Sequence, residues 1–471
     1  ALGWRMSEEA FLNDVDWLDN LKLRVSYGEV GNDGINSSLW SQNWEATSDK
    51  RYQGAVNGAF LPSYSLGADM ANKDLKWETT ITRNIGVDFG FFNSRLTGTI
   101  DAYWNTTKDL LMKTAIPGIT GFTSTYANVG QTSNKGIEIA LQGVLVKTRD
   151  WNVTAGFNIN FNRGKVDKLA DNVTGLYGTE WATSSTFPKS DYVLKEGRPV
   201  GLVRGLTADG FYTTDDFTYA NGVYTLKEGV ADVSSAVFPN YHLHNGMNER
   251  PAGQLAYPGM AKFKDLNDDG IINDDDVDVI GDMTPVHTGG FNINATYKNF
   301  DLGLYFNWSY GNEIYNVNKL AALYGYKEGA VYENKLSIVK DCYKIYDVVN
   351  GELVALTTPE QLNAANANAK LPLAYSENGY VSTLGIEDGS YLRLNTLTLG
   401  YTLPKSMLQK AGISNLRVYG SIYNVFTITG YSGIDAEVST STSTKTYPQL
   451  GMDWGTYPRA RSFVLGVNLS F

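Results

Sequence analysis

The last stretch of the chain, residues 459–471, constrains the fold most because apolar and mostly polar residues alternate along it. The apolar residues occupy the odd positions Phe463, Leu465, Val467, Leu469 and Phe471. The even positions carry Ser462, Val464, Gly466, Asn468 and Ser470. Side chains of a β-strand point alternately to opposite faces, so this period of two predicts a strand with one apolar and one mostly polar face.

The same alternation recurs along most of the chain. The segments that show it are 21–28, 79–91, 95–105, 134–146, 151–163, 191–196, 200–206, 288–298, 300–310, 391–402 and 416–427. The clearest is 151–163, whose polar face carries Asn, Thr and Gly instead of the Lys and Glu expected on a strand that faces water. Such a face suits a crowded polar interior. In 416–427 the outward face stays open, since Leu416, Val418 and Ile422 compete with Tyr419, Tyr423 and Val425.

The connections between these strands alternate between short and long. The long ones span about 31–76, 108–133, 164–190, 208–287, 311–390 and 429–458. Counted back from Phe471, every tight turn falls on one rim and every long loop on the other. Transmembrane β-barrels have this anatomy, with short periplasmic turns and long extracellular loops, whereas Greek-key sandwiches do not require it. The sequence therefore predicts an all-β fold, a transmembrane antiparallel β-barrel with about twelve strands in this chain.

Length and charge exclude several other classes. With 471 residues and no Pro-rich or Ser-rich linker, the chain holds either several β domains or one large closed sheet. The sequence contains no run of about 18 apolar residues, so it predicts no transmembrane helix. A net charge of −11 without a Lys/Arg cluster argues against nucleic acid. A single cysteine, Cys342, excludes an internal disulfide and a multi-Cys metal site.

The first residues, Ala1 to Trp4, resemble the end of a strand that enters a short turn. Because no initiator Met or signal peptide is visible, we expect the C-terminal part of a larger barrel; a complete pore of modest size is the alternative. On this view Phe471 lies at the rim of tight turns. The edge of the terminal strand that faces away from 416–427 then has no partner strand in this chain, or it pairs with a strand from another polypeptide segment.

An acidic loop carries the sharpest local motif, a candidate calcium site. Oxygen-bearing residues fall at relative positions 1, 3, 5, 7, 9 and 12, the seventh through its backbone carbonyl: Asp265, Asn267, Asp269, Ile271, Asn273 and Asp276. Gly270 at position 6 permits the sharp turn that wraps hard oxygens around Ca²⁺. Asp276 stands where a longer Glu usually supplies two oxygens, which predicts weak affinity. A solvated acidic turn is the alternative.

Loop aromatics are candidates for substrate contact by stacking on sugar rings: Trp40, Trp44, Tyr52, Trp181 and Trp454. Packing within the loops is the competing interpretation. His242 and His244 lack a third metal ligand at a recognisable spacing. No Ser/His/Asp arrangement, phosphate-binding loop or dinucleotide fingerprint is present, so we expect no enzyme and no catalytic residue.

Eight stretches together resemble the SusC/RagA-type TonB-dependent outer-membrane transporters. They are LGWRMSEEAFL (2–12), WLDNLKLRVSYGEVGN (17–32), LKWETTITRNIGVDFGFFNSRLTGTIDAYWNTTKDLL (75–111), NVGQTSNKGIEIAL (128–141), LKEGRPVG (194–201), KFKDLNDDGIINDDD (262–276), YLRLNTLTLGYTLP (391–404) and YPRARSFVLGVNLSF (457–471). The similarity touches nearly every predicted strand in order, and no single motif carries it.

The resemblance implies a 22-stranded barrel in the outer membrane of a Gram-negative bacterium, with an N-terminal plug and a segment that interacts with TonB. It also implies a SusD-like lipoprotein lid and active import of an oligosaccharide or a peptide. The sequence matches the barrel wall and its loops. It matches neither the plug nor the TonB-interacting segment. A passive porin is the alternative function. An outer-membrane phospholipase would need a Ser/His dyad, which we do not find.

Overall fold

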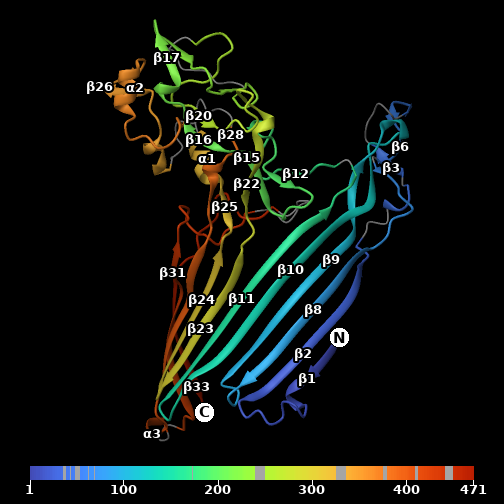
Figure 1. Cartoon of the computed structure of the whole chain (residues 1–471), viewed down its shortest axis with the longest axis vertical. Helices are drawn as coiled ribbons and strands as arrows, with labels where there is room; N and C mark the ends of the chain where they lie inside the picture. The colour runs from blue at the N-terminus through green and yellow to red at the C-terminus, as the bar shows by residue number, and fades with distance from the viewer. Residues whose placement is uncertain are drawn as a thin grey trace.

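The computed structural model shows a tall, curved antiparallel sheet with irregular segments gathered above it (Figure 1). The described residues are 1–34, 39–42, 44–47, 54–61, 63–67, 69–171, 173–238, 250–324, 336–374, 379–408, 412–440 and 449–471. Within them, no helix is long and apolar enough to cross a membrane.

Eleven strands follow one another in chain order and form what we call the wall, and a twelfth, β7 (Asp69–Met70), pairs with β10. The wall strands are β1 (Leu2–Arg5), β2 (Leu18–Asn32), β8 (Glu78–Phe91), β9 (Leu96–Ala115), β10 (Ser124–Lys147), β11 (Trp151–Lys168), β23 (His287–Tyr297), β24 (Phe300–Tyr310), β30 (Tyr391–Thr402), β31 (Asn415–Thr429) and β33 (Ser462–Ser470). Ten of the twelve predicted strands thus lie in the wall, and several extend beyond their predicted ends.

Tight and long connections lie at opposite ends of the wall (Figure 1). The tight ones include 92–95, 148–150 and 298–299, and the connection that holds helix α3 (Lys405–Leu408) lies at the same end. The long connections 169–286 and 311–390 lie at the other. The predicted alternation is confirmed for the strands of the wall. The predicted long loop 108–133 is wrong, because β9 runs to Ala115 and β10 begins at Ser124, which leaves a connection of residues 116–123.

Cross-strand register settles the facing of β31, which the sequence left open. Leu416 pairs with Leu469, Val418 with Val467 and Ile422 with Phe463. The even residues of β31 therefore share the apolar face of β33, while Tyr419 and Tyr423 share its polar face. The apolar face is exposed in the isolated chain: Phe463 is 71% and Leu465 89% exposed.

One predicted hairpin does not belong to the wall. Residues 191–206 do form two antiparallel strands, β14 (Tyr192–Leu194) and β15 (Leu202–Leu206). They belong to a separate four-stranded sheet in the order β12–β14–β15–β22. Consecutive residues are buried in both strands, Tyr192 and Val193 in β14 and Leu202 and Val203 in β15. Protein therefore covers both faces of these short strands, and neither face is available to lipid. The predicted loops 164–190 and 208–287 are accordingly parts of one long connection between β11 and β23.

The long connections contain short elements. Between β2 and β8 lie β3 (Trp44–Thr47), β4 (Ala55–Val56), β5 (Ala59–Phe60) and β6 (Ser63–Leu66). Between β11 and β23 lie β12 (Leu176–Gly178), β13 (Thr186–Phe187), β14, β15, β16 (Ala208–Phe211), β17 (Phe217–Ala220), β18 (Val223–Leu226), β19 (Asp232–Val233), β20 (Ala261–Phe263), β21 (Ile271–Ile272), η6 (Asp274–Asp276) and β22 (Val277–Asp282). After β24 come β25 (Glu313–Asn316), α1 (Val317–Tyr324), η7 (Ser337–Asp341), β26 (Tyr346–Val349), β27 (Glu352–Ala355), α2 (Pro359–Ala365), β28 (Gly379–Tyr380), η8 (Thr383–Gly385) and β29 (Ile386–Asp388), and β32 (Met452–Asp453) precedes β33. The described residues also form three further 3-10 turns, η1 (Met6–Glu8), η4 (Gly118–Thr120) and η5 (Thr214–Asp216).

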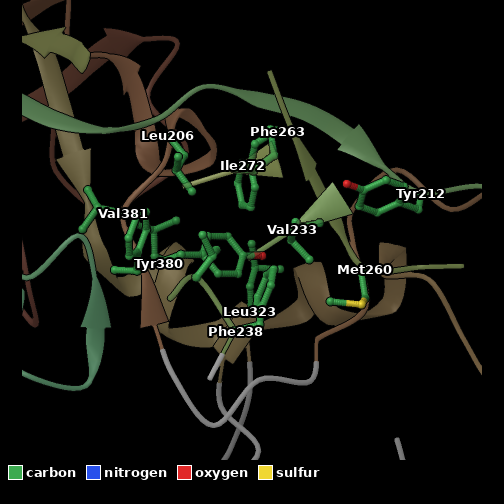
Figure 2. Close-up of a cluster of buried hydrophobic side chains, with 14 of the residues drawn as sticks. Leu206, Tyr212, Val233, Phe238, Met260, Phe263, Ile272, Leu323, Tyr380 and Val381 are labelled. Atoms are coloured by element: carbon green, nitrogen blue, oxygen red, sulfur yellow. The ribbon is translucent and has the colours of Figure 1, made fainter. Parts of the chain in front are cut away.

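The main buried core lies above the wall. We call the described residues of 169–286, 311–390 and 430–461 the loop module. Its core unites residues that are distant in sequence, among them Leu206, Ile272, Phe263, Leu323 and Tyr380 (Figure 2). Full burial of such a side chain contributes about 1.5–3 kcal/mol, so the long connections fold as a packed body.

The two outer edges of the sheet have one partner strand each among the described residues. β33 pairs with β31, and β1 pairs with β2. β2 pairs on its other side with β8 and not with β33. Ser470 lies opposite Asn415, the first residue after the α3 connection, so the C-terminus lies at the end with the tight turns, as predicted (Figure 1).

Glycines on the polar face let side chains reach over one strand to the next. Tyr103 of β9 donates its hydroxyl to Asn162 of β11 at 2.8 Å, across Gly136 of β10. A Cβ at position 136 would lie 2.4 Å from the Tyr103 hydroxyl and 2.5 Å from the backbone oxygen of Phe161. Gly86 lies in the same way beneath the ion pair between Arg24 and Asp101.

Gly136→Ala is expected to destabilise the folded protein by about 1–3 kcal/mol, because the new methyl group meets a backbone oxygen that cannot move aside cheaply. Gly164→Ala in β11 is the matched control, since a Cβ there meets no atom within 4 Å. Equilibrium unfolding of the full-length protein in lipid or detergent measures both. Equal effects of the two substitutions would contradict the steric account.

Candidate functional site

The polar face of the wall carries charged side chains that are paired with one another. Arg24 of β2 bonds Asp88 of β8 at 2.9 Å and Asp101 of β9 at 2.8 Å. Arg417 of β31 donates its Nε to Asp301 of β24 at 2.8 Å, across Gly400 of β30. Asn and Thr occupy many of the positions between these pairs, as the sequence predicted for β11. The face is therefore hydrophilic, and its arginines Arg24 and Arg417 are paired with carboxylates of neighbouring strands.

A buried ionic network ties the last long connection to the top of the wall. Arg393 of β30 is 4% exposed and bonds Asp435, and its Nη1 donates to Glu437 at 3.1 Å and its Nε to Thr427 at 3.0 Å. Arg459 reaches Glu437 at 2.9 Å from the more exposed side. The network fixes residues 435–437 and 459 against β30 and β31.

A buried carboxylate, Asp191, holds the segment that follows β12 in the loop module. The Asp191 side chain, fully buried, accepts the backbone N–H groups of Glu180 at 2.8 Å, Trp181 at 2.8 Å and Ala182 at 3.0 Å. Burial raises the pKa of the Asp191 carboxyl, and the three backbone hydrogen bonds act in the opposite direction. The segment 180–182 is thereby held in one conformation.

The candidate calcium loop folds into a tight, hydrogen-bonded turn. Asp265 accepts the N–H of Gly270 at 2.7 Å, Asp269 that of Ile271 at 2.9 Å, and the buried Asp276 that of Asn273 at 2.8 Å. Across the described ranges, no group of three acidic, His or Cys side chains is arranged to hold a metal ion. The carboxylates instead bond backbone N–H groups, and calcium binding stays a prediction.

The candidate stacking aromatics do not form one site. Trp40 and Trp44, 56% and 67% exposed, lie in the connection between β2 and β8. Trp181 packs against the loop-module core, with its ring 6.4 Å from that of Tyr315, and Trp454, 48% exposed, lies near β32. Tyr52 lies outside the described residues, as do His242 and His244. Trp181 thus has a packing role, and a role of the others in substrate contact stays a prediction.

Sequence reasoning missed a cavity of about 460 Å³ in the loop module. Residues 184–190, Arg204, residues 235–237 and Asp274 line it. These segments come together only through the fold, so no spacing in the sequence marks them. A basic residue in an otherwise apolar strand, Arg204 in β15, is the one signal that the sequence offers.

A wall with one apolar and one polar face, tight turns at one end and a packed loop module at the other is typical of a transmembrane β-barrel of the outer-membrane class. The family model described as "TonB dependent receptor-like, beta-barrel" matches residues 3–425, and the chain belongs to this family of outer-membrane proteins. The predicted resemblance to the SusC/RagA type is confirmed by relatives and solved structures.

TonB-dependent receptor P3 of Formosa agariphila is 30% identical over 480 residues, which cover 100% of this chain and 41% of the relative. TonB-dependent receptor SusC of Bacteroides thetaiotaomicron is 29% identical over 480 residues, 100% of this chain and 39% of the relative. The chain thus spans less than half the length of these relatives, which are named as receptors and not as enzymes.

Solved structures show the same fold. The structure of the RagAB peptide transporter superposes with a TM-score of 0.68 at 24% identity, covering 100% of this chain and 43% of that chain. The RagAB peptide importer in the "open-open" state gives a TM-score of 0.69 at 23% identity, with 100% and 42% coverage. The wall and the loop module therefore both have counterparts in that fold.

Arg393→Gln is expected to cost about 3–5 kcal/mol, because it removes the closer cation from the buried Asp435 carboxylate and leaves only Arg459, at 4.0 Å. Arg459→Gln removes the same charge from a side chain that is 49% exposed and is expected to cost less than about 1 kcal/mol. Chemical unfolding, with limited proteolysis of residues 430–440, compares the two. If both variants lose the same stability, the buried network does not hold this segment.

Proposed function

We propose that the full-length protein imports an oligosaccharide or a peptide actively across the outer membrane of a Gram-negative bacterium, with energy supplied through TonB. The carrying observation is the family match over residues 3–425 together with the polar face of the wall and its Arg–Asp pairs. In this proposal the apolar face contacts lipid, the polar face lines the passage, and the loop module lies on the extracellular side.

A SusD-like surface lipoprotein is the proposed partner, because the relatives include SusC and the solved neighbours include the RagAB peptide transporter. TonB would act on a part of the full-length protein other than the wall and the loop module. The packed loop module offers the lipoprotein a preformed surface, since its core is buried and its ends are fixed to the wall.

Uptake of labelled oligosaccharides and oligopeptides by cells that express the full-length protein tests the transport proposal. Uptake of the transported class is expected to fall to background when TonB is deleted or the proton-motive force is collapsed. Deletion of the SusD-like lipoprotein is expected to lower this uptake at limiting substrate concentration. Uptake that continues unchanged without TonB would instead establish a passive porin.

We also propose that the loop 265–276 binds one Ca²⁺ weakly, with Asp265, Asn267, Asp269, Asn273 and Asp276 turning oxygens towards the ion and Ile271 offering its carbonyl. The order of the residues and the turn at Gly270 (φ +85°) support this proposal. Binding would require these carboxylates to exchange backbone N–H bonds for the ion. Its role would be to stiffen the loop module.

Calorimetric titration of the metal-free full-length protein with CaCl₂ is expected to show one site with a dissociation constant of about 10⁻⁴–10⁻³ M. The double substitution Asp265→Asn and Asp269→Asn is expected to abolish the heat. Asp268→Asn is the matched control, because it removes a charge from the same loop at a position that supplies no ligand. No calcium heat in the unaltered protein would disprove the site.

A further inference from the structure

The cavity of about 460 Å³ in the loop module has the size of a small-ligand site, for which about 300–1,000 Å³ is typical. Residues 184–190, which include β13, form one side, and Arg204 of β15 and residues 235–237 form others. Serine hydroxyls at positions 184, 185, 190 and 235 line it, together with the Phe187 side chain. The lining is thus rich in groups that both donate and accept hydrogen bonds.

Arg204 is the most informative residue of this cavity. Its Nη1 donates to Ser190 Oγ at 2.8 Å, and its guanidinium carbon lies 4.8 Å from the centre of the Tyr177 ring. These two contacts hold the guanidinium in place. Among the described residues, no carboxylate forms a salt bridge with it within 4.0 Å. Burial lowers the pKa of the Arg204 guanidinium, and the nearby Tyr177 and the Asp274 carboxylate oppose this shift only in part.

The charges around the cavity favour an anion. Arg204 and the exposed Lys189 are positive, and Asp274 is the negative residue of the lining. A guanidinium presents paired N–H groups that match the two oxygens of a carboxylate. The Asp274 carboxylate in the same lining can accept hydrogen bonds from hydroxyl groups of a ligand. A ligand with one carboxylate and several hydroxyls satisfies both kinds of group.

We propose that this cavity is a binding subsite for an acidic sugar, a hexuronate unit whose carboxylate pairs with Arg204 and whose hydroxyls bond the serines and Asp274. This inference rests on the oligosaccharide form of the proposed function. A peptide fits less well, because extended peptides add to a free strand edge. β15, which carries Arg204, has both edges occupied, by β14 and by β22.

Calorimetry on the purified full-length protein tests the subsite with galacturonate and glucuronate against galactose and glucose, at low ionic strength. Each uronate is expected to bind more tightly than its neutral counterpart by roughly 10- to 100-fold, the range for a hydrogen bond to a charged group. The preference is expected to shrink as NaCl is added. Equal affinity for acidic and neutral sugars would overturn the proposal.

Substitutions then locate the effect. Arg204→Gln is expected to remove the uronate preference and Arg204→Lys to restore part of it. Ser185→Trp, at an exposed position on the lining, is expected to block the cavity while the unfolding temperature stays unchanged. Arg149→Gln is the matched control, since it removes the same charge from the tight turn between β10 and β11. An equal effect of Arg149→Gln, or none of Arg204→Gln, would refute the subsite.

An N-acetylated dipeptide with a free carboxylate is the second probe. If it binds as tightly as the uronates and with the same dependence on Arg204, the sugar assignment is wrong. The subsite proposal and the transport proposal can be disproved independently. Uronate binding together with TonB-independent uptake overturns the transport proposal alone. TonB-dependent uptake without uronate preference overturns the subsite alone.

Discussion

The structure depends on the hydrogen-bond ladder between neighbouring wall strands. A strand satisfies its backbone groups only through partners on both sides, and in a membrane no water replaces a missing partner. The pairing runs in chain order from β1 to β33, so each strand is built beside its predecessor. The ladder sets the register, and the register sends alternate residues to opposite faces. The apolar face, the polar face and the placement of the loops all follow from this one constraint.

The polar face adds interactions that span three strands. Arg24 reaches Asp101 across Gly86, Tyr103 reaches Asn162 across Gly136, and Arg417 reaches Asp301 across Gly400. In each case the glycine leaves the room that the contact needs. Glycine is costly in a strand, and here that cost is offset by a contact between its two neighbours. Such contacts couple strands that do not pair directly, and the two that join Arg to Asp also neutralise charge on the polar face.

The wall is well predicted from the sequence, because few structures other than a long strand place apolar residues at every second position over ten or more residues. Residues 151–163 lie in a wall strand as predicted, and the terminal residues lie at the predicted end. Alternation fails where strands are short. Tyr192 of β14 and Val203 and Leu206 of β15 are buried in the loop-module core. From the sequence, these two short strands were nevertheless predicted to be membrane strands. The facing of β31 also required a partner, because both of its faces carry apolar residues.

The candidate sites were harder to predict, because they depend on contacts between distant segments. The calcium motif is local and therefore visible in the sequence, although its carboxylates bond the backbone of their own loop. The Arg204 cavity unites segments from 184 to 274 and leaves no spacing to recognise. Trp181 looks like an exposed aromatic in the sequence, but it packs against the loop-module core. Packing of this kind is decided by the fold and not by residue type.

The central claim is that one face of the wall contacts lipid and the other a polar passage. Single nitroxide labels at Val153, Phe157 and Ile159, and at Thr154, Asn158 and Asn160, test it in full-length protein reconstituted into bilayers, in a cysteine-free background. The odd-numbered labels are expected to collide mainly with oxygen dissolved in lipid, and the even-numbered labels mainly with a water-soluble nickel chelate. Equal exposure of both sets to the same quencher would contradict the claim.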